Sequence, residues 1–300
     1  MPEITEVRKY ADFLKKHLKN KYIQKINILK GRYKKKPFKI TIQLPIKVLD
    51  IKTKGKFLYF ILNNFENKIF FFSTLGLSGG WTFFSKSNKY TFPKLIDYIN
   101  NAKINTYRKI ALNNLNIEFQ TDKGSIYYYD PLSFGTFKII TDEQELIKKL
   151  STIGPDIMEE TTTFELFESQ LRKTINTAKP IGNVIVNQKI ISGLGNYLRA
   201  DILWLSRISP FRQTEDLTKK DLQIIYKNAR LLTWGEFNNT NKHRHISQYK
   251  HRHISQYKHL PRNYNRNFFV YKCDKDIYGN DVKIELLGDR KIYWVPNIQI

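Results

Sequence analysis

The first residues of the chain, Met1-Pro2-Glu3, combine a potential amine nucleophile with a carboxylate beside it. Removal of Met1, which is usual before proline, would make the secondary amine of Pro2 the chain terminus. Attack of such an amine on a sugar C1′ gives an iminium ion, which accepts electrons without further protonation. Glu3 and Glu6 could act as acid/base groups. The same residues also suit a helix start, where proline and acidic side chains are favoured.

A second group of residues suited to chemistry lies in the segment ISGLGNYLRADILW, residues 191–204. Gly193 and Gly195 allow the backbone to approach a ligand closely, and the helix start after them presents N–H groups that suit a phosphate. Asn196 adds a side-chain donor. Taken alone, the pattern fits a simple junction between two helices equally well.

The pattern of apolar residues predicts the elements that must position these groups. Apolar residues recur at helical spacing as far as Asn20, which indicates one amphipathic helix. Short β-branched and aromatic runs follow from Tyr22 to about Ile140 and are typical of a β-sandwich or barrel. Beyond Pro155, longer apolar-periodic segments predict consecutive helices, and the tail alternates around Gly279 and Asn280 like a β-hairpin.

We therefore expect an α+β protein with two domains. The boundaries follow from the run Ser-Thr-Ile-Gly-Pro at 151–155, which is typical of a domain junction. The expected parts are an N-terminal domain at residues 1–140, a linker at 141–153, and a C-terminal helical domain at 154–300 with its hairpin at 268–300.

The octapeptide HRHISQYK stands twice in tandem, at residues 243–250 and 251–258. Histidines at positions i and i+2 could bind a metal. A recent duplication in a tolerant basic loop is the simpler interpretation.

Composition points to a polyanionic partner, with nucleic acid as the first candidate. The formal charge is +24, from 51 Lys and Arg against 27 Asp and Glu, although an AT-rich genome accounts for part of it. The single cysteine, Cys273, excludes an internal disulfide and any multi-cysteine zinc site, and it favours a reducing intracellular compartment. No signal peptide or membrane span is expected.

Seven motifs occur in one order along the chain, and together they resemble the formamidopyrimidine-DNA glycosylase/endonuclease VIII (Fpg/Nei) family. The similarity to the family's motifs is carried by MPEITEVR (1–8), GKFL (55–58), TLGLSG (74–79), DPLSFG (130–135), IGPDI (153–157), GLGNYLRADIL (193–203) and GDRKIYWVPNIQ (288–299).

The resemblance implies a bifunctional DNA glycosylase/AP lyase that excises oxidised bases, cleaves the strand by β,δ-elimination and needs no cofactor. It implies an N-terminal helix and β-sandwich, and a C-terminal helix-two-turn-helix with a terminal hairpin. Pro2 would attack C1′ of a damaged deoxynucleotide, and Glu3 would transfer protons at the opening sugar. Lys56, Asn196 and Arg290 would bind phosphates of the damaged DNA, and Lys56 would also take part in catalysis by assisting the elimination.

Two departures from the family's pattern refine this expectation. The family's Met, Arg and Phe, which fill the gap left by a rotated nucleotide, are matched by Leu77, Leu132 and Phe134. Because the arginine is missing, we expect weak preference for the opposite base. The missing arginine and the zincless hairpin described next together resemble the endonuclease VIII branch, which implies oxidised pyrimidines and ring-opened or hydantoin purines as substrates.

The second departure concerns the family's zinc finger. Val295 and Ile298 stand in place of the last cysteine pair, and Cys273 is one ligand alone. We therefore expect a zincless hairpin that binds no metal, since a structural zinc site needs four ligands. Apolar packing would replace coordination, through Tyr293, Trp294, Val282 and Ile284.

Two alternatives remain open at this stage. One is a noncatalytic damaged-DNA-binding protein, against which the set Pro2, Glu3 and Lys56 argues. The other is an RNA- or ribosome-binding protein that shares only the helix-two-turn-helix. We expect a monomer whose partner is damaged DNA, because both domains of one chain form the DNA cleft in such enzymes.

Overall fold

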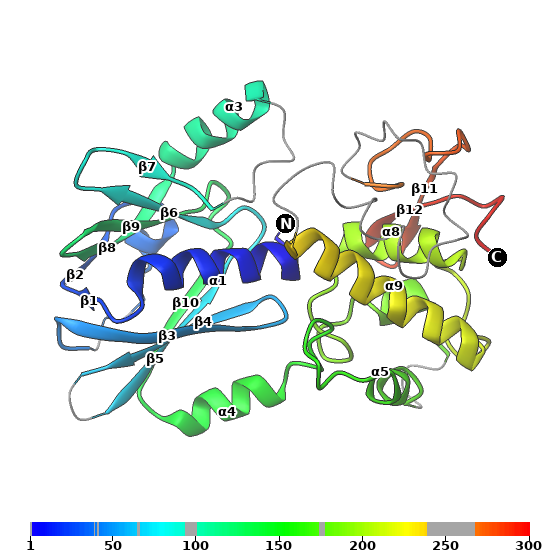
Figure 1. Cartoon of the computed structure of the whole chain (residues 1–300), viewed down its shortest axis with the longest axis horizontal. Helices are drawn as coiled ribbons and strands as arrows, with labels where there is room; N and C mark the ends of the chain where they lie inside the picture. The colour runs from blue at the N-terminus through cyan, green and yellow to red at the C-terminus, as the bar shows by residue number, and fades with distance from the viewer. Residues whose placement is uncertain are drawn as a thin grey trace. The chain divides into compact units, whose positions relative to one another are not determined.

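The computed structural model describes residues 2–38, 40, 42–64, 67–93, 101–173, 178–238 and 268–300, with nothing said of the side chains at 101–104. The chain divides into two compact units, Met1–Thr152 and Ile153–Ile300 (Figure 1). The tandem octapeptides at 243–258, and with them the metal interpretation of their histidines, lie outside the described residues. Within the described ranges, no helix is long and apolar enough to cross a membrane.

The first unit contains two five-stranded antiparallel sheets and the helix α1 (Ile4–Leu18). Helix α1 packs along strands of both sheets (Figure 1). One sheet has the order β1 (Tyr22–Ile23), β3 (Ile46–Lys54), β4 (Phe57–Asn63), β5 (Lys68–Thr74), β10 (Thr136–Ile140). The other has the order β2 (Lys25–Ile28), β8 (Leu115–Thr121), β9 (Gly124–Tyr129), β6 (Gly80–Ser85), β7 (Tyr90–Thr91).

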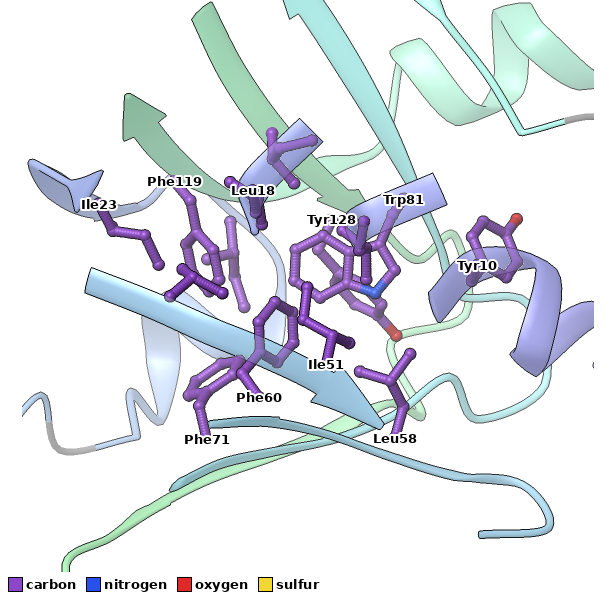
Figure 2. Close-up of a cluster of buried hydrophobic side chains, with 14 of the residues drawn as sticks. Tyr10, Leu18, Ile23, Ile51, Leu58, Phe60, Phe71, Trp81, Phe119 and Tyr128 are labelled. Carbon is purple, nitrogen blue, oxygen red and sulfur yellow. The ribbon is translucent and has the colours of Figure 1, made fainter. Parts of the chain in front are cut away.

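Aromatic side chains from both sheets form the core of this unit (Figure 2). Phe60 and Phe71 come from the first sheet, and their rings lie 6.0 and 5.3 Å from that of Phe119 in the second. The rings of Trp81 and Tyr128 are 5.1 Å apart in a T-shaped contact. All five side chains are at most 1% exposed, and full burial of each contributes about 1.5–3 kcal/mol.

The described residues of the first unit also form the helices α2 (Arg32–Lys35), α3 (Asn101–Leu112) and α4 (Glu143–Ser151). Helix α4 occupies most of the range 141–153 that the sequence indicated as a linker. The Asp142 side chain caps it by accepting the backbone N–H of Gln144 at 2.8 Å. Lys54 Nζ also donates to the Leu150 carbonyl at 2.8 Å, which joins the end of α4 to β3.

Within the described ranges, the helices of the second unit are α5 (Phe164–Leu171), α7 (Ile181–Val184), α8 (Asn196–Ser206) and α9 (Lys219–Asn238). Helix α8 packs on α9.

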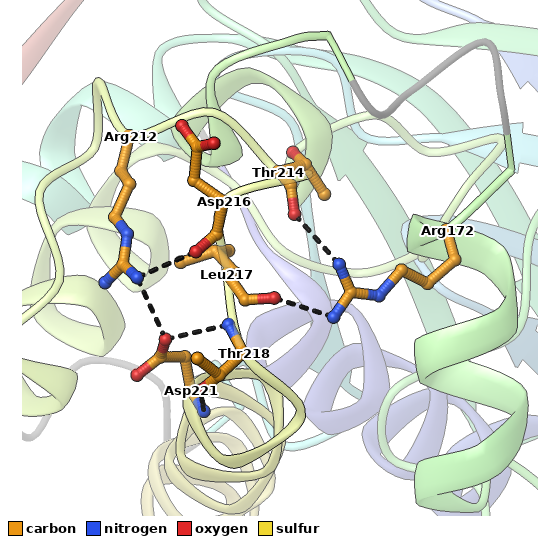
Figure 3. Close-up of polar contacts among 7 residues, drawn as sticks. All are labelled: Arg172, Arg212, Thr214, Asp216, Leu217, Thr218 and Asp221. Atoms are coloured by element: carbon orange, nitrogen blue, oxygen red, sulfur yellow. Dashed lines mark hydrogen bonds and ion pairs between the residues drawn. The ribbon is translucent and has the colours of Figure 1, made fainter.

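Two arginines fix the loop that leads into α9 (Figure 3). Arg172 donates to the carbonyls of Thr214 at 3.3 Å and Leu217 at 2.7 Å. Arg212 contacts the carboxylate of Asp221 at 3.1 Å, and the same carboxylate accepts the backbone N–H of Thr218 at 2.9 Å, at the start of α9.

The chain ends in a hairpin of β11 (Lys283–Leu287) and β12 (Arg290–Trp294). Its turn is at Gly288-Asp289, and Gly288 has the positive φ of +65° that such turns require. The sequence indicated a hairpin turning at Gly279 and Asn280, but these residues form a separate tight loop with one bridge between Lys275 and Asp281.

Candidate functional site

Pro2 and Glu3 lie directly before α1, in the first unit. Pro2 is half-buried, and Glu3 is 1% exposed and is the N-cap residue of the helix. Glu6 Oε2 accepts the backbone N–H of Glu3 at 2.8 Å, as part of a capping box. The residue after Pro2 therefore carries a buried carboxyl group, and the capping box at the start of α1 fixes the position of that residue.

Lys56 lies in a two-residue turn between β3 and β4. The strands pair Lys54 with Phe57, which leaves Gly55 and Lys56 as the turn. Gly55 has a φ of +55°, a conformation that glycine adopts without strain. Lys56 is half-exposed. Helix α1 packs against β3 and β4, so the same sheet supports the helix that follows Pro2 and the turn that presents the Lys56 cation.

Leu77, Leu132 and Phe134 are exposed on two loops of the same unit. Leu77 lies between β5 and β6, and the other two lie between β9 and β10. Their side chains are 45, 56 and 55% exposed, so neither leucine is an ordinary core residue. Large apolar side chains presented together on loops are typical of a binding surface.

The buried side chain of Asp130 joins these two loops. Its Oδ1 accepts the Ser78 hydroxyl at 2.6 Å, and its Oδ2 accepts the backbone N–H of Gly135 at 2.7 Å. Ser78 Oγ in turn accepts the N–H of Leu132 at 3.0 Å. Hydrogen bonds thus hold together the two loops that carry these apolar residues. The loops also approach each other closely at Gly76, where a Cβ atom would lie only 2.6 Å from Gly135 N.

Two tyrosines behind the loops also donate to Asp130. The hydroxyls of Tyr33 and Tyr128 lie 2.8 and 3.2 Å from Oδ2. Burial, followed by the interaction with Asp130, raises the pKa of both phenols above the ordinary value. Both hydroxyls therefore stay protonated and act as donors at neutral pH.

In the second unit, Asn196 is the first residue of α8 and is half-buried. The preceding loop is fixed by Gln188, which accepts the N–H of Gly193 at 2.9 Å and donates to the Leu194 carbonyl at 2.8 Å. Gly193 has a φ of +108°. Asn196 thus lies at the N-terminus of α8, where the first backbone N–H groups of a helix have no partner within the helix.

Arg290 lies at the tip of the terminal hairpin with an exposed side chain. The adjacent peptide is anchored from within the unit by Arg199, which is 0% exposed. Arg199 donates to the Lys291 carbonyl at 3.1 Å and to the Gly182 carbonyl at 3.2 Å. This buried guanidinium joins β12 to α7.

The apolar packing predicted to replace zinc is present for three of the four residues. Val282 and Tyr293 pack against a cluster that contains Val295, and Trp294 contacts Phe211 with ring centroids 5.2 Å apart. The prediction for Ile284 is wrong, because its side chain is 54% exposed.

Buried carboxylates add polar contacts to this packing. Asp201 accepts the backbone N–H groups of residues 269–271 at 3.0–3.3 Å. Burial raises its pKa to about 7, although these three hydrogen bonds act in the opposite direction. Asp276 accepts Trp204 Nε1 at 3.2 Å and the N–H of Asn280 at 2.9 Å.

No group of three or more His, Cys, Asp or Glu side chains in the described ranges could hold a metal ion, and Cys273 is a free thiol.

Sequence reasoning assigned no role to Arg199, Asp201 or Asp130. A signal existed for the first two, since Arg199 and Asp201 interrupt an apolar run in a helix that is buried on nearly every side. Charged side chains in such a helix need specific partners. Their partners are backbone groups distant in sequence, which no local pattern indicates.

Comparison with known proteins gives a consistent result along the chain. Sequence profiles described as the formamidopyrimidine-DNA glycosylase N-terminal domain and H2TH domain match residues 1–137 and 153–233.

A formamidopyrimidine-DNA glycosylase of Mycoplasma mobile is 31% identical over 234 residues, which cover 76% of this chain and 75% of that protein. Endonuclease 8 of Salmonella arizonae is 25% identical and covers all of both chains.

Among solved structures, Lactococcus lactis formamidopyrimidine-DNA glycosylase, bound non-covalently to DNA containing an AP site, superposes with a TM-score of 0.72. The match covers 99% of each chain at 18% identity. This likeness confirms the predicted fold, with an N-terminal helix, a β-sandwich and a helical C-terminal part.

Proposed function

Because the chain belongs to the formamidopyrimidine-DNA glycosylase family, we propose that it excises oxidised bases from DNA and cleaves the strand with the amine of Pro2 as nucleophile. The observation that carries this proposal is the position of Pro2, directly before the buried, helix-capping carboxyl group of Glu3. That pair supplies a nucleophile and a proton donor at one helix start.

The first step joins the Pro2 nitrogen to C1′ of the damaged nucleotide. The glycosidic bond breaks, and the base leaves with the bonding electrons and takes up a proton. Opening of the sugar then breaks the C1′–O4′ bond. Glu3 supplies the proton to O4′, and the C1′–N bond becomes an iminium ion.

The iminium ion makes strand cleavage possible. Loss of a C2′ proton moves electrons toward the cationic nitrogen, and their return expels the 3′ phosphate and leaves a conjugated iminium ion. Loss of the C4′ proton then expels the 5′ phosphate in a second elimination. Water hydrolyses the iminium ion and frees Pro2. Since the iminium ion is the electron sink, the scheme uses no cofactor.

DNA binding is proposed to involve two kinds of contact. Lys56, Asn196 and Arg290 bind phosphates, and Arg290 suits this role because its planar guanidinium can bind a phosphate through two donors. Leu77, together with Leu132 and Phe134, occupies the space left by the rotated nucleotide. Their exposure and the Asp130 network that fixes their loops support this assignment.

The lesion class is proposed from Leu132. The family's motif has an arginine at this position, and an aliphatic side chain offers no hydrogen bond to the orphaned base. We therefore infer oxidised pyrimidines and ring-opened or hydantoin purines as substrates, with little preference for the opposite base.

Borohydride trapping on an oligonucleotide with an abasic site tests the catalytic proposal. The wild-type chain should form a covalent adduct, and Pro2→Gly should not. A chain with one uncleaved residue before Pro2 should also give no adduct, because its proline nitrogen is acylated. The matched control carries the same extension after Ile300 and should be trapped like wild type. If the wild-type protein binds the DNA without being trapped, it is a noncatalytic damage-binding protein.

A further inference from the structure

Five cationic side chains lie within the seven residues from Lys30 to Lys36, which we call the basic segment. The segment includes the short helix α2, and its cationic residues are all exposed. They are Lys30, Arg32, Lys34, Lys35 and Lys36.

The basic segment is attached to the loop that carries Leu132 and Phe134. Tyr33 is 4% exposed, and its hydroxyl lies 2.8 Å from Asp130 Oδ2 and 3.1 Å from the Gly135 carbonyl. The Arg32 guanidinium donates to the same carbonyl at 2.6 Å. These bonds hold Arg32 and Tyr33, and with them the backbone of α2, against the loop that carries Leu132 and Phe134.

Three of these cations have no counter-charge within the described parts of the chain. Lys34, Lys35 and Lys36 form no ion pair there, whereas Lys30 and Arg32 donate to backbone carbonyls. Adjacent like charges repel, so this arrangement favours an anionic partner. A regular array of phosphates beside an apolar wedge has the matching charge and position.

We propose that the basic segment binds phosphates of the duplex next to the place where Leu132 and Phe134 enter it, and that it contributes affinity but no chemistry. This inference rests on the proposed function. Because phosphate contacts position a protein without reading sequence, the contribution is the same for every lesion.

The test is a salt titration of the triple variant Lys34→Ala/Lys35→Ala/Lys36→Ala. Its affinity for a duplex carrying a tetrahydrofuran abasic analogue is measured from roughly 50 to 200 mM salt. Each lost phosphate contact should make the slope of log K against log salt less steep by about 0.9. The ratio of wild-type to variant affinity should then change by about 3-fold between the lowest and the highest salt concentration.

The matched control removes three lysines at the opposite end of the same sheet. In the pairing of β6 with β9, Gly80 pairs with Tyr129 near the apolar loops, and Ser85 pairs with Gly124 at the far end. Lys86, Lys89 and Lys123 lie at that far end and are exposed. Their triple alanine variant should keep the wild-type slope.

Three outcomes separate this inference from the proposed function. A smaller slope in the first variant alone, with an unchanged single-turnover lyase rate at saturating DNA, supports the inference. Equal slopes in both variants, or a lower saturated rate in the first, overturn it. Failure of wild-type protein to be trapped on an abasic site counts against the proposed function and leaves the slope comparison valid. Thermal unfolding of each variant checks that the exposed substitutions leave the fold intact.

Discussion

Substitution of Arg199 by methionine should lower both the stability of the second unit and its affinity for damaged DNA. Methionine fills a similar volume, so the main loss is the pair of hydrogen bonds to Gly182 and Lys291. An unsatisfied buried acceptor costs about 1–3 kcal/mol. Gly182 is buried, but Lys291 is exposed and water can reach its carbonyl. The expected loss is therefore about 1–3 kcal/mol, measured by urea unfolding.

The loss of affinity should arise through Arg290, which adjoins the anchored peptide of Lys291. A misplaced charge-assisted contact corresponds to about 1.5–3 kcal/mol, or about 10- to 100-fold in Kd for the abasic-analogue duplex. A double-mutant cycle with Arg290→Ala separates positioning from general loss of stability. If Arg199 acts through Arg290, the double variant should bind as weakly as Arg290→Ala alone.

Two results would refute this reasoning. One is an unfolding free energy of Arg199→Met within about 0.5 kcal/mol of wild type, the range of ordinary surface substitutions. The other is full additivity of the two affinity losses. Arg199→Lys is the matched control: it retains the charge but lacks the planar fork that reaches two carbonyls, so it should restore affinity only in part.

Three other predictions concern Asp201, Leu132 and zinc. The raised pKa of Asp201, about 7, means that its contribution to stability is full below its unfolded pKa and is lost as pH rises toward 7. Wild type should therefore lose stability relative to Asp201→Asn between about pH 4 and pH 7, and parallel urea-unfolding curves would contradict this. Leu132→Arg should introduce a preference among the four opposite bases in excision assays, whereas wild type should show little; a strong wild-type bias would sink the interpretation of Leu132. Purified protein should contain no stoichiometric zinc by elemental analysis, and a chelator should leave its unfolding temperature unchanged.

The sequence predicts the regular elements well where one local pattern dominates. The helix after Pro2 has apolar residues at helical spacing, and it forms as α1. The β-rich region forms two sheets, and the apolar runs of its central strands β4 and β5 are buried along nearly their whole length. The order of the strands is harder to predict from the sequence. Strand β10 pairs with β5, and β2 pairs with β8, over long distances in sequence that no local pattern specifies.

Element boundaries show why local patterns can mislead. We predicted the range 141–153 as a linker between the domains, and the helix α4, capped by Asp142, occupies most of it. Near the C-terminus, Gly279-Asn280 and Gly288-Asp289 are both good turn sequences. The first forms a loop around the Asp276 carboxylate, and the second forms the hairpin turn. Side-chain hydrogen bonds decide between them, and these depend on the tertiary structure.

Within the candidate site, the sequence suggests which residues face DNA but does not indicate how they are supported. In the role proposed for Leu77, Leu132 and Phe134, their loops would have to stay fixed while the side chains occupy the space of a rotated nucleotide, and exposed apolar side chains do not stabilise a loop by burial. Asp130 provides the support, since it binds both loops and is itself buried. Arg199 has the corresponding role beside Arg290 in the second unit. In both places a buried charged group binds backbone atoms of an exposed element, so substitutions there should impair DNA binding without touching DNA.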